Sequence, residues 1–463
     1  MTRTLITGGL VVTAAEETHA DVLVEDGRVA ALATPGSQQW TADRVIDASR
    51  KYVVPGGVDA HTHMEMPFGG TFSSDTFETG TRAAAWGGTT TIIDFAIQSK
   101  GGSLRAGLDA WHEKADGRCA IDYGFHMIAS DVNESTLKEM DALVEEGVTS
   151  FKLFMAYPGV FYSDDGQILR AMQRAGQNGG LIMVHAENGI AIDVLVEQAV
   201  ARGHTDPRVH GEVRKALLEA EATYRAIKLA QVAGAPLYVV HVSAAEAVAE
   251  LTRARDEGLN VFGETCPQYL FLSTDNLAEP DFEGAKYVCS TPLRPREHQA
   301  ALWRGLRSND LQVVSTDHCP FCFTGQKELG RGDFSKIPNG LPGVENRMDL
   351  LHQAVVDGHI SRRRWIEIAC ATPARMFGLY PQKGTIAPGS DADIVIYDPR
   401  AEQVISAETH HMNVDYSAYE GRRLTGRVET VLSRGEPVIS QRTYTGRAGH
   451  GAYTPRSTCQ YLN

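Results

Sequence analysis

Eight apolar, β-rich runs recur along the middle of the chain, and this repetition limits the possible folds more than any other feature. The runs lie at 52–60, 89–95, 121–128, 149–155, 181–187, 237–243, 259–266 and 311–318. Most are apolar throughout rather than alternating, which is typical of parallel strands buried on both faces. Between them, the segments 134–147 and 244–258 have apolar residues at helical spacing, and each ends in glycine. Strand and helix in alternation predict an α/β fold, namely a (β/α)8 TIM barrel.

The two ends of the chain differ from this middle part. Residues 1–52 and 383–440 contain short β-like runs that Gly and Asp interrupt at close intervals, a pattern typical of hairpins. We therefore expect the barrel at 53–382, with a second, smaller β-sandwich domain built from both termini. The polar tail at 441–463 is expected to be extended or packed on a neighbouring subunit.

Composition and charge argue against several classes of partner. The formal net charge of −14 is unfavourable for binding a nucleic acid or an anionic membrane surface. No run of 18 apolar residues occurs, so no membrane span is expected, and the N-terminal segment lacks the apolar region of a signal peptide. The seven cysteines are few for a chain of 463 residues, which favours a reducing compartment, and we predict a cytoplasmic protein.

Two of the cysteines, Cys319 and Cys322, have the spacing of a CxxC motif in "CPFC". Such a pair can act in redox chemistry or bind zinc. Neither a second CxxC nor a thioredoxin-like pattern accompanies it, so a chemical role for this pair is the weaker interpretation.

Ionisable side chains follow the ends of several predicted strands. Taken singly, a histidine there is usually a hydrogen-bonded structural residue, and an aspartate is often a helix cap. Taken together, they meet at the mouth of one barrel, where unpaired buried polar groups would cost stability and where barrel enzymes build their sites. The sequence therefore predicts a metal site formed by His61, His63, His185, His241 and Asp317.

Lys152 lies inside the fourth predicted strand, between Phe151 and Leu153. An ammonium group has no lone pair and cannot bind a cation, but burial among apolar neighbours favours the neutral amine. A neutral amine can add carbon dioxide and become a carbamate, whose two oxygens can bridge two cations. The alternative is an unmodified lysine that reaches solvent or pairs with Asp317.

Six motifs, in order, resemble the dihydropyrimidinase and hydantoinase branch of the cyclic amidohydrolases. They are "GGVDAHTH", "SFKLFMAY", "VHAEN", "VVHVS", "STDHCPF" and "IPNGLPGVE". The resemblance covers nearly the whole chain, including the flanks "RVIDASRKYVVPG" and "GTIAPGSDADIVIYDP". It implies a hydrolase whose small-molecule substrates are cyclic amides or imides. Such an enzyme opens the ring of 5,6-dihydropyrimidines or hydantoins and releases N-carbamoyl amino acids.

The resemblance also implies a role for each site residue. Two zinc ions, for which other divalent metals could substitute, are held by His61, His63 and Asp317 on one side and by His185 and His241 on the other. Lys152, as N6-carboxylysine, bridges them. Asp317 moves a proton from the attacking water to the leaving nitrogen, and Tyr157 polarises the carbonyl. Backbone groups of Ser290 and Asn339 bind the ring amide, and the assembly is a homotetramer.

Three alternatives remain open at this point. An allantoinase shares the barrel and the bridging lysine. A dihydroorotase acts on a substrate with a carboxylate, for which Arg294 is a candidate partner. A non-catalytic scaffold relative has lost metal ligands, whereas no ligand position departs from the family pattern here. The ring substituent is expected to meet a set of apolar rim residues, each of which could equally serve only packing: Met64, Met66, Phe68, Phe154 and Val160.

Overall fold

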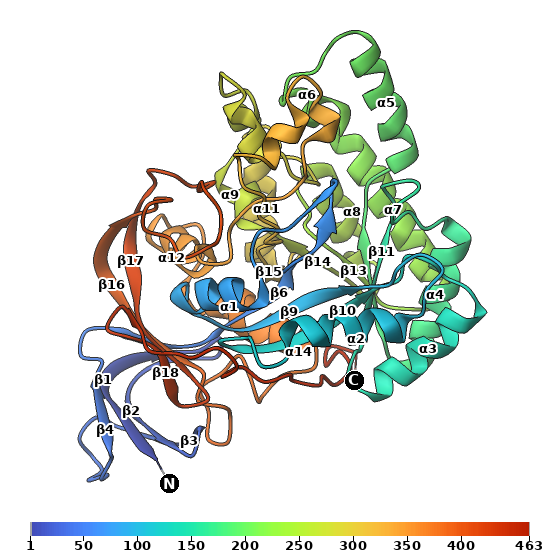
Figure 1. Cartoon of the computed structure of the whole chain (residues 1–463). Coiled ribbons are helices and arrows are strands. Elements are labelled where there is room, and N and C mark those ends of the chain that lie inside the picture. The colour runs from blue at the N-terminus through green and yellow to red at the C-terminus, as the bar shows by residue number, and fades with distance from the viewer. Residues whose placement is uncertain (1, 463) are drawn as a thin grey trace.

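A closed barrel of eight parallel strands lies at the centre of the computed structural model, which describes residues 2–462 (Figure 1). In chain order the strands are β6 Gly57–Thr62, β9 Thr89–Ile97, β10 Asp122–Ile128, β11 Ser150–Phe154, β12 Leu181–His185, β13 Leu237–Val239, β14 Val261–Thr265 and β15 Val313–Val314. Each pairs with its neighbour in sequence, and a parallel bridge between Thr62 and His318 closes the ring from β6 to the segment after β15. The predicted (β/α)8 barrel is confirmed.

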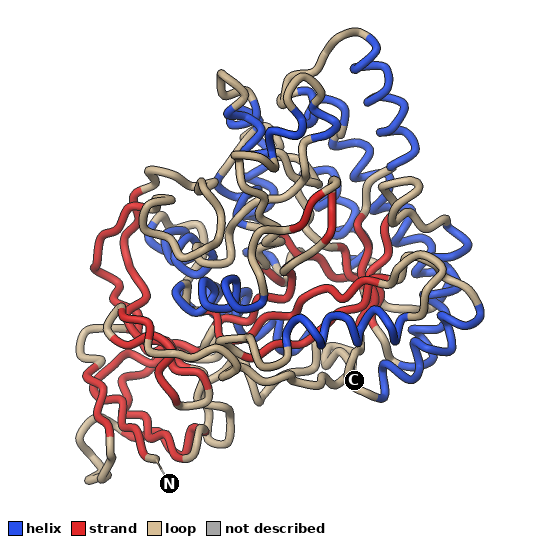
Figure 2. The backbone as a smooth tube through the Cα atoms, in the orientation of Figure 1, coloured by secondary structure: helices blue, strands red, loops and turns tan. Residues whose placement is uncertain are grey.

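Helices surround the strands on the outside of the barrel (Figure 2). The longer ones are α1 Phe77–Trp86, α2 Leu104–Ala115, α3 Glu134–Glu145, α4 Asp165–Asn178, α5 Gly189–Ala201, α7 Ala216–Ala233, α8 Ala245–Asp256, α11 Glu297–Ser308 and α12 Arg347–Val356. Shorter ones lie in the connections and after α12: α6 Val209–Val213, α9 Pro267–Phe271, α10 Thr274–Leu277, α13 Arg362–Ile366 and α14 Thr372–Met376. The two helices expected from the sequence are α3 and α8. Asn133 caps α3 by accepting hydrogen bonds from the first backbone N–H groups.

The apolar run at 52–60 forms two strands and not one, which corrects the sequence prediction. β5 (Tyr52–Pro55) pairs with strands from both chain ends, whereas β6 begins the barrel. The chain passes from one sheet to the other at Gly56, where a Cβ atom would lie 2.0 Å from the Thr90 hydroxyl oxygen. Hydrophobic periodicity cannot detect this break, because both strands are buried.

The flanking strands form one nine-stranded sheet built from both ends of the chain, with the blue and red strands side by side in Figure 1. Side chains from the first and the last strands, among them Ile6, Val22, Ile394 and Leu432, pack in a common core. A bent sheet that encloses such a core has the two layers expected of a sandwich. The other strands of this sheet are β1 Arg3–Val12, β2 Glu17–Glu25, β3 Arg28–Ala33, β4 Arg44–Asp47, β16 Ile394–Val404, β17 Arg423–Ser433, β18 Glu436–Ser440 and β19 Thr443–Tyr444.

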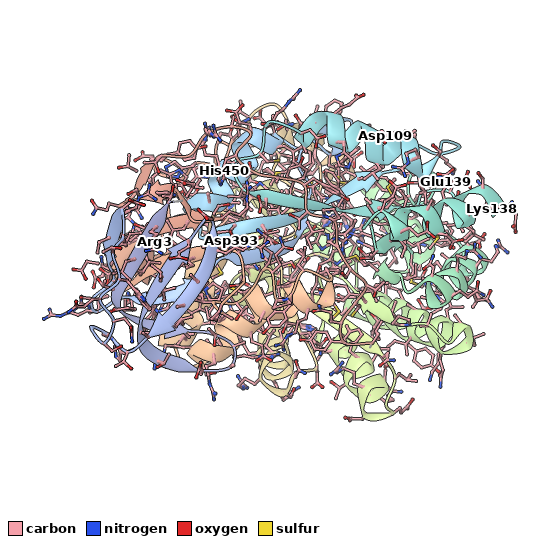
Figure 3. The ribbon with its side chains drawn as sticks, turned by 90° about the horizontal axis from the view of Figure 1, so that it is seen from below. Arg3, Asp109, Lys138, Glu139, Asp393 and His450 are labelled. Carbon is pink, nitrogen blue, oxygen red and sulfur yellow. The ribbon has the colours of Figure 1, made fainter. Side chains whose placement is uncertain are left out.

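The C-terminal tail is extended and packs on its own barrel. The Thr454 N–H donates to the Tyr123 carbonyl at 2.7 Å, and the Arg456 N–H donates to the Gly147 carbonyl at 3.0 Å. Arg434 connects the start of the tail to the flanking sheet, because its guanidinium contacts the His450 carbonyl and its backbone N–H donates to Asp393. Figure 3 labels both partners, His450 and Asp393. No helix among residues 2–462 is both long and apolar enough to cross a membrane.

A buried ion cluster joins the flanking sheet to the barrel. The Lys383 ammonium lies 2.5 Å from a carboxylate oxygen of Asp122, 3.0 Å from one of Asp391 and 2.8 Å from one of Asp393, and all four side chains are at most 6% exposed. Burial lowers the pKa of Lys383, but the three carboxylates raise it further than burial lowers it. The lysine is therefore charged, and it compensates carboxylates that would otherwise repel one another.

Lys383→Met is expected to lower the free energy of unfolding by about 3–5 kcal/mol, because it leaves buried carboxylates without this cation. The midpoint of urea unfolding measures the effect. The matched control is Lys336→Met, since Lys336 is 70% exposed and pairs with Asp333 at 3.2 Å. This exposed pair is worth roughly 0–1 kcal/mol. Equal midpoints for the two variants would contradict the role assigned to the cluster.

Candidate metal centre and active site

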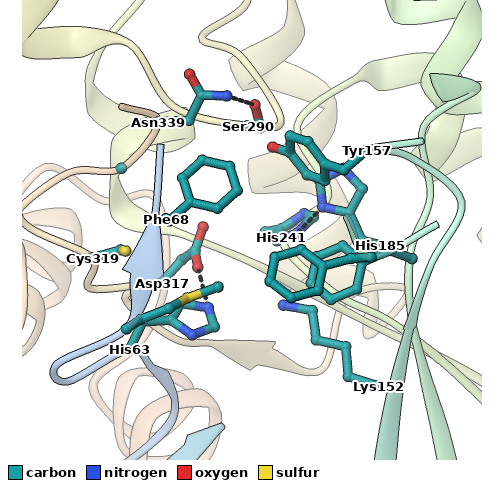
Figure 4. Close-up of a pocket in the computed structure, with 14 residues that line it drawn as sticks. His63, Phe68, Lys152, Tyr157, His185, His241, Ser290, Asp317, Cys319 and Asn339 are labelled. Atoms are coloured by element: carbon teal, nitrogen blue, oxygen red, sulfur yellow. Dashed lines mark hydrogen bonds and ion pairs between the residues drawn. The ribbon is translucent and has the colours of Figure 1, made fainter. Parts of the chain in front are cut away.

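The predicted metal-site residues gather at one end of the barrel because each lies in, ends or follows a parallel strand. His61 lies in β6 and His63 directly after it, His185 ends β12, and His241 and Asp317 follow β13 and β15. Lys152 lies in β11 and extends toward the histidines (Figure 4). Parallel strands present their carboxyl ends at the same mouth, so residues far apart in sequence share one site.

One group of metal-binding atoms consists of His61, His63 and Asp317, whose ligand atoms all lie within 4.8 Å of one another. An Asp317 carboxylate oxygen is 3.2 Å from the His61 Nε2 and 3.3 Å from the His63 Nε2. Burial lowers the pKa of both imidazoles. Burial also raises the pKa of Asp317, but the two histidines lower it more, to about 2. Two imidazoles that favour the neutral form and one carboxylate are the donor set of a divalent cation.

A second group consists of His185 and His241. The His185 Nδ1 and the His241 Nε2 lie 2.9 Å apart, while the His185 Nε2 is 2.8 Å from a Glu187 carboxylate oxygen. Glu187 accepts a hydrogen bond from the N–H at Nε2 of His185. In the neutral ring the lone pair therefore lies on Nδ1, which faces His241. Burial lowers the pKa of both imidazoles. Two neutral imidazoles that face each other in this way are well placed to share a cation.

Lys152 stands between the two groups. It is 1% exposed, its Nζ lies 2.9 Å from the His61 Nε2, and it faces the rings of Phe95 and Phe154 at 4.4 and 4.9 Å from their centroids. Burial lowers its pKa to about 8. The pairing with Asp317, which was the alternative to a modified lysine, is present only as an electrostatic attraction that partly opposes this shift. An ammonium is poorly accommodated among imidazoles, so these surroundings fit a modified lysine better than a free one.

Buried carboxylates behind the histidines set their orientation. Glu264 contacts the His61 Nδ1, accepts the Tyr238 hydroxyl at 2.8 Å, and accepts the His241 backbone N–H at 3.2 Å. With Nδ1 of His61 occupied in this way, its Nε2 is left to bind a metal. Glu187 does the same for His185 and is itself paired with Arg214 at 2.6 Å. Such partners are a usual feature of metal-binding histidines.

A single pocket brings eight of the nine predicted site residues together, and His61 lies fully buried beneath it. Asn339 donates from its side-chain amide to the Ser290 hydroxyl at 3.1 Å. Burial raises the pKa of the Tyr157 hydroxyl, so that this group is protonated near neutral pH and can donate a hydrogen bond. The pocket residues named by the sequence are His63, Lys152, Tyr157, His185, His241, Ser290, Asp317 and Asn339.

The apolar rim agrees only in part with the sequence prediction. Met66, Phe68 and Phe154 line the pocket, Met64 is buried outside it, and Val160 is 55% exposed and lines a neighbouring outer cavity. Phe68 lies on the short hairpin of β7 (Pro67–Phe68) and β8 (Thr71–Phe72). Phe161, Cys319 and Gly340 also line the pocket, although the sequence did not indicate them. The sequence could have indicated Phe161, because it is an aromatic residue next to Val160. Its ring stacks on that of Phe154, with 5.0 Å between the ring centroids.

Two minor interpretations lose support. Arg294 does not line this pocket, and its guanidinium is committed to Glu219 at 2.7 Å and to the Ser243 hydroxyl at 3.0 Å. It is therefore not available to clamp a substrate carboxylate. Cys319 and Cys322 are both free thiols, and burial raises the pKa of each. Neither belongs to a metal-binding group found among the described residues.

An eight-stranded barrel with buried imidazoles and a carboxylate at its mouth is the architecture of a barrel metallohydrolase. The chain belongs to the amidohydrolase family, whose model matches residues 52–438.

The chain is 86% identical to a D-hydantoinase of Streptomyces coelicolor, with 99% of each sequence covered. It is similar to the crystal structure of a dihydropyrimidinase from Brevibacillus agri, with a TM-score of 0.97, 52% identity and 99% of each chain covered. An L-hydantoinase from Arthrobacter aurescens is less similar, with a TM-score of 0.89 and 31% identity over 98% of this chain and all of the other (100%).

Glu264→Gln is expected to weaken metal binding by about 10–100-fold, because the amide cannot accept from all the groups that the carboxylate now holds. Competition with a chelator of known zinc affinity measures the change. The control is Glu139→Gln, since Glu139 accepts the backbone N–H groups of Leu104 and Arg105, away from the pocket. Unchanged zinc affinity in Glu264→Gln would show that His61 keeps its orientation without this carboxylate.

Proposed function

We propose that this chain is a metal-dependent cyclic amidohydrolase that opens hydantoins or 5,6-dihydropyrimidines to N-carbamoyl amino acids. One observation carries the proposal: three buried imidazoles, a carboxylate and a buried lysine line one pocket together with Tyr157, Ser290 and Asn339, and a fourth imidazole, that of His61, lies beneath it. The names of two relatives support the substrate class: one is a D-hydantoinase and the other a dihydropyrimidinase, and the similarity to each covers 99% of both chains.

The donor set supports two divalent ions, with zinc as the proposed metal. His61, His63 and Asp317 hold one, and His185 and His241 hold the other. When bound, a pair of such ions lowers the pKa of a water molecule and polarises a substrate carbonyl. Nitrogen and carboxylate ligands suit zinc, and they suit manganese and cobalt as well, so metal analysis of the purified protein decides the identity.

We infer that Lys152 is carboxylated, and its surroundings support this modification. The Lys152 amine has an imidazole nitrogen at 2.9 Å and two aromatic rings around it. A carbamate would convert this cationic group into an anion with two oxygens, and its negative charge would compensate the cations held by the two ligand groups. A pKa of about 8 leaves a useful fraction of the amine neutral at physiological pH, which is the form that reacts with carbon dioxide.

The remaining residues position the ring and move protons. Asp317 takes the proton of the attacking water and delivers it to the leaving ring nitrogen. The Tyr157 hydroxyl donates to the carbonyl oxygen as that oxygen gains negative charge. Backbone groups of Ser290 and Asn339 hold the ring amide. Met66, Phe68, Phe154 and Phe161 enclose the ring substituent, which favours apolar substituents.

Substrate assays test the proposal directly. The zinc-loaded enzyme is given dihydrouracil, hydantoin, a 5-aryl hydantoin of each hand, allantoin and dihydroorotate, and carbamoyl product is quantified. We expect turnover of hydantoins and dihydrouracil, with preference for the D form because the similar proteins include D-hydantoinases. Turnover of allantoin or dihydroorotate alone would replace this proposal. No turnover with full metal content would favour a non-catalytic relative.

The proposal extends to assembly and location. We propose a homotetramer, and α5 and α7 support it by exposing apolar side chains that a second copy could cover: Ile190, Val194, Leu217 and Tyr224. Light scattering coupled to size exclusion gives the mass. We propose the cytoplasm as the location, in agreement with free thiols at all seven cysteines.

Lys152→Ala is expected to lose most of its metal and its activity, because no other side chain can supply a bridging carboxylate at this position. Metal content by mass spectrometry of the dissolved protein, and activity with and without added acetate or propionate, measure the effect. A short carboxylic acid can occupy the vacated space and restore part of the activity. Full metal occupancy in the variant would contradict a bridging role.

Tyr157→Phe is expected to lower kcat by about 10²–10³-fold, because one donor to the developing oxyanion is removed while the ring's packing remains. Metal content stays unchanged, since Tyr157 is not a ligand. Tyr162→Phe is the matched control on the same loop, and its kcat stays close to that of the wild type. An effect on KM alone would assign Tyr157 to ground-state binding.

A further inference from the structure

A third fully buried lysine, besides Lys152 and Lys383, lies behind the pocket. Lys327 begins a 3-10 helix at Lys327–Gly330 and is 0% exposed. Its ammonium donates to three backbone carbonyls, at 2.9 Å to Val288, 2.7 Å to Pro338 and 2.8 Å to Gly340. No carboxylate pairs with it among residues 2–462, and three carbonyl oxygens match the three N–H bonds of an ammonium.

The three carbonyls belong to the two segments that carry the ring-binding residues. Val288 precedes Ser290 by two positions, and Pro338 and Gly340 flank Asn339 on either side. The segments also touch directly, because the Gly340 N–H donates to the Val288 carbonyl at 3.0 Å and the Asn339 amide donates to the Ser290 hydroxyl at 3.1 Å. Lys327 does not line the pocket itself, so it acts only through these segments.

This arrangement fixes the direction of the Asn339 carbonyl. In a planar trans peptide the C=O and the N–H point in opposite directions. The Gly340 N–H points at Val288, on the side where Lys327 lies, so the Asn339 carbonyl of the same peptide points the other way. Within the described part of the chain, no hydrogen bond reaches that carbonyl. It is therefore free to accept a hydrogen bond from a ligand.

Simple packing does not explain a lysine at this place. Burial lowers its pKa to about 7, which shows how strongly the surroundings oppose the charge. An apolar side chain would fill the space without that penalty. It would, however, leave the Pro338 and Gly340 carbonyl oxygens without a donor, since only the Val288 carbonyl has a second one, the Gly340 N–H. Buried acceptors without a donor destabilise a fold. Lys327 therefore stabilises this backbone conformation, because it satisfies carbonyl oxygens that would otherwise be buried without a donor.

We propose that Lys327 is a positioning residue for substrate binding, which clamps the segments 288–290 and 338–340 together so that the Asn339 carbonyl accepts a ring N–H. The inference rests on the proposed function, because it assumes a cyclic amide in the pocket. It assigns a role to a residue that touches neither the metal ligands nor the substrate.

Lys327→Met tests the clamp, since methionine is similar in length and has no donor. In the zinc-loaded enzyme we expect KM for a hydantoin to rise about 10-fold or more, with kcat within about 3-fold of the wild type, as for loss of a contact that ground state and transition state share. Metal content stays unchanged. The matched control is Lys383→Met, which changes another buried lysine that does not line the pocket, and which lowers stability and leaves KM unchanged.

A ring-methylated competitor gives a second readout that a general loss of stability would not move. Wild-type enzyme should bind hydantoin more tightly than its analogue methylated at the ring nitrogen, and Lys327→Met should shrink this ratio. A KM and a ratio equal to those of the wild type would overturn the inference. So would an equal rise of KM in Lys383→Met.

Lys327→Gln keeps one amide donor and is expected to fall between the wild type and Lys327→Met in KM. Failure of both Lys327 variants to fold would assign the lysine to stability alone and overturn the inference. If the wild-type enzyme turns over no cyclic amide, the proposed function fails first, and that result is separate from any result with the variants.

Discussion

The arrangement of the site at the mouth of the barrel depends on which proton or cation interacts with the lone pairs of the buried imidazole nitrogens. Four imidazoles lie in a region that favours their neutral forms, and the His185 Nδ1 faces the His241 Nε2 at 2.9 Å. Facing lone pairs repel unless a proton or a cation lies between them, and burial disfavours the proton. Glu264 and Glu187 bind the outer nitrogens of His61 and His185 and so commit the inner ones to the centre. The protein has thus arranged its polar core for a cation.

The backbone of the site is also held away from its preferred conformation. Tyr157, His241 and Asp317 have φ angles of 63°, 40° and 52°, in the left-handed region that non-glycine residues rarely adopt. Each costs of order 1–3 kcal/mol and persists only where the surroundings fix it. For His241 these surroundings are Glu264, which accepts its N–H, and Thr291, whose hydroxyl donates to its carbonyl at 3.1 Å. The same carboxylate therefore orients one ligand and holds the strained backbone of another.

The sequence was sufficient to predict the features that come from repeated patterns or from chemically unusual residues. Parallel strands have apolar runs, and histidines after them stand out, so the barrel and the family could be predicted. The break at Gly56 could not, because both strands that it separates are buried. Phe161, Glu264 and Lys327 were missed for another reason: a single Phe, Glu or Lys has many ordinary roles, and only tertiary contacts show which one it has. Arg294 shows the reverse error, since a plausible charge turned out to be paired with Glu219.

Lys152 and Lys327 show how far surroundings decide the chemistry of one residue type. Both are fully buried and both have a lowered pKa, of about 8 and about 7. Lys327 is surrounded by three carbonyl oxygens, which satisfy an ammonium and would repel a carbamate. Lys152 is surrounded by imidazoles and aromatic rings, which offer an ammonium little and leave room for cations that a carbamate would bind. Burial lowers the pKa of both lysines, and the groups around each one then distinguish the proposed clamp, Lys327, from the proposed bridging ligand, Lys152.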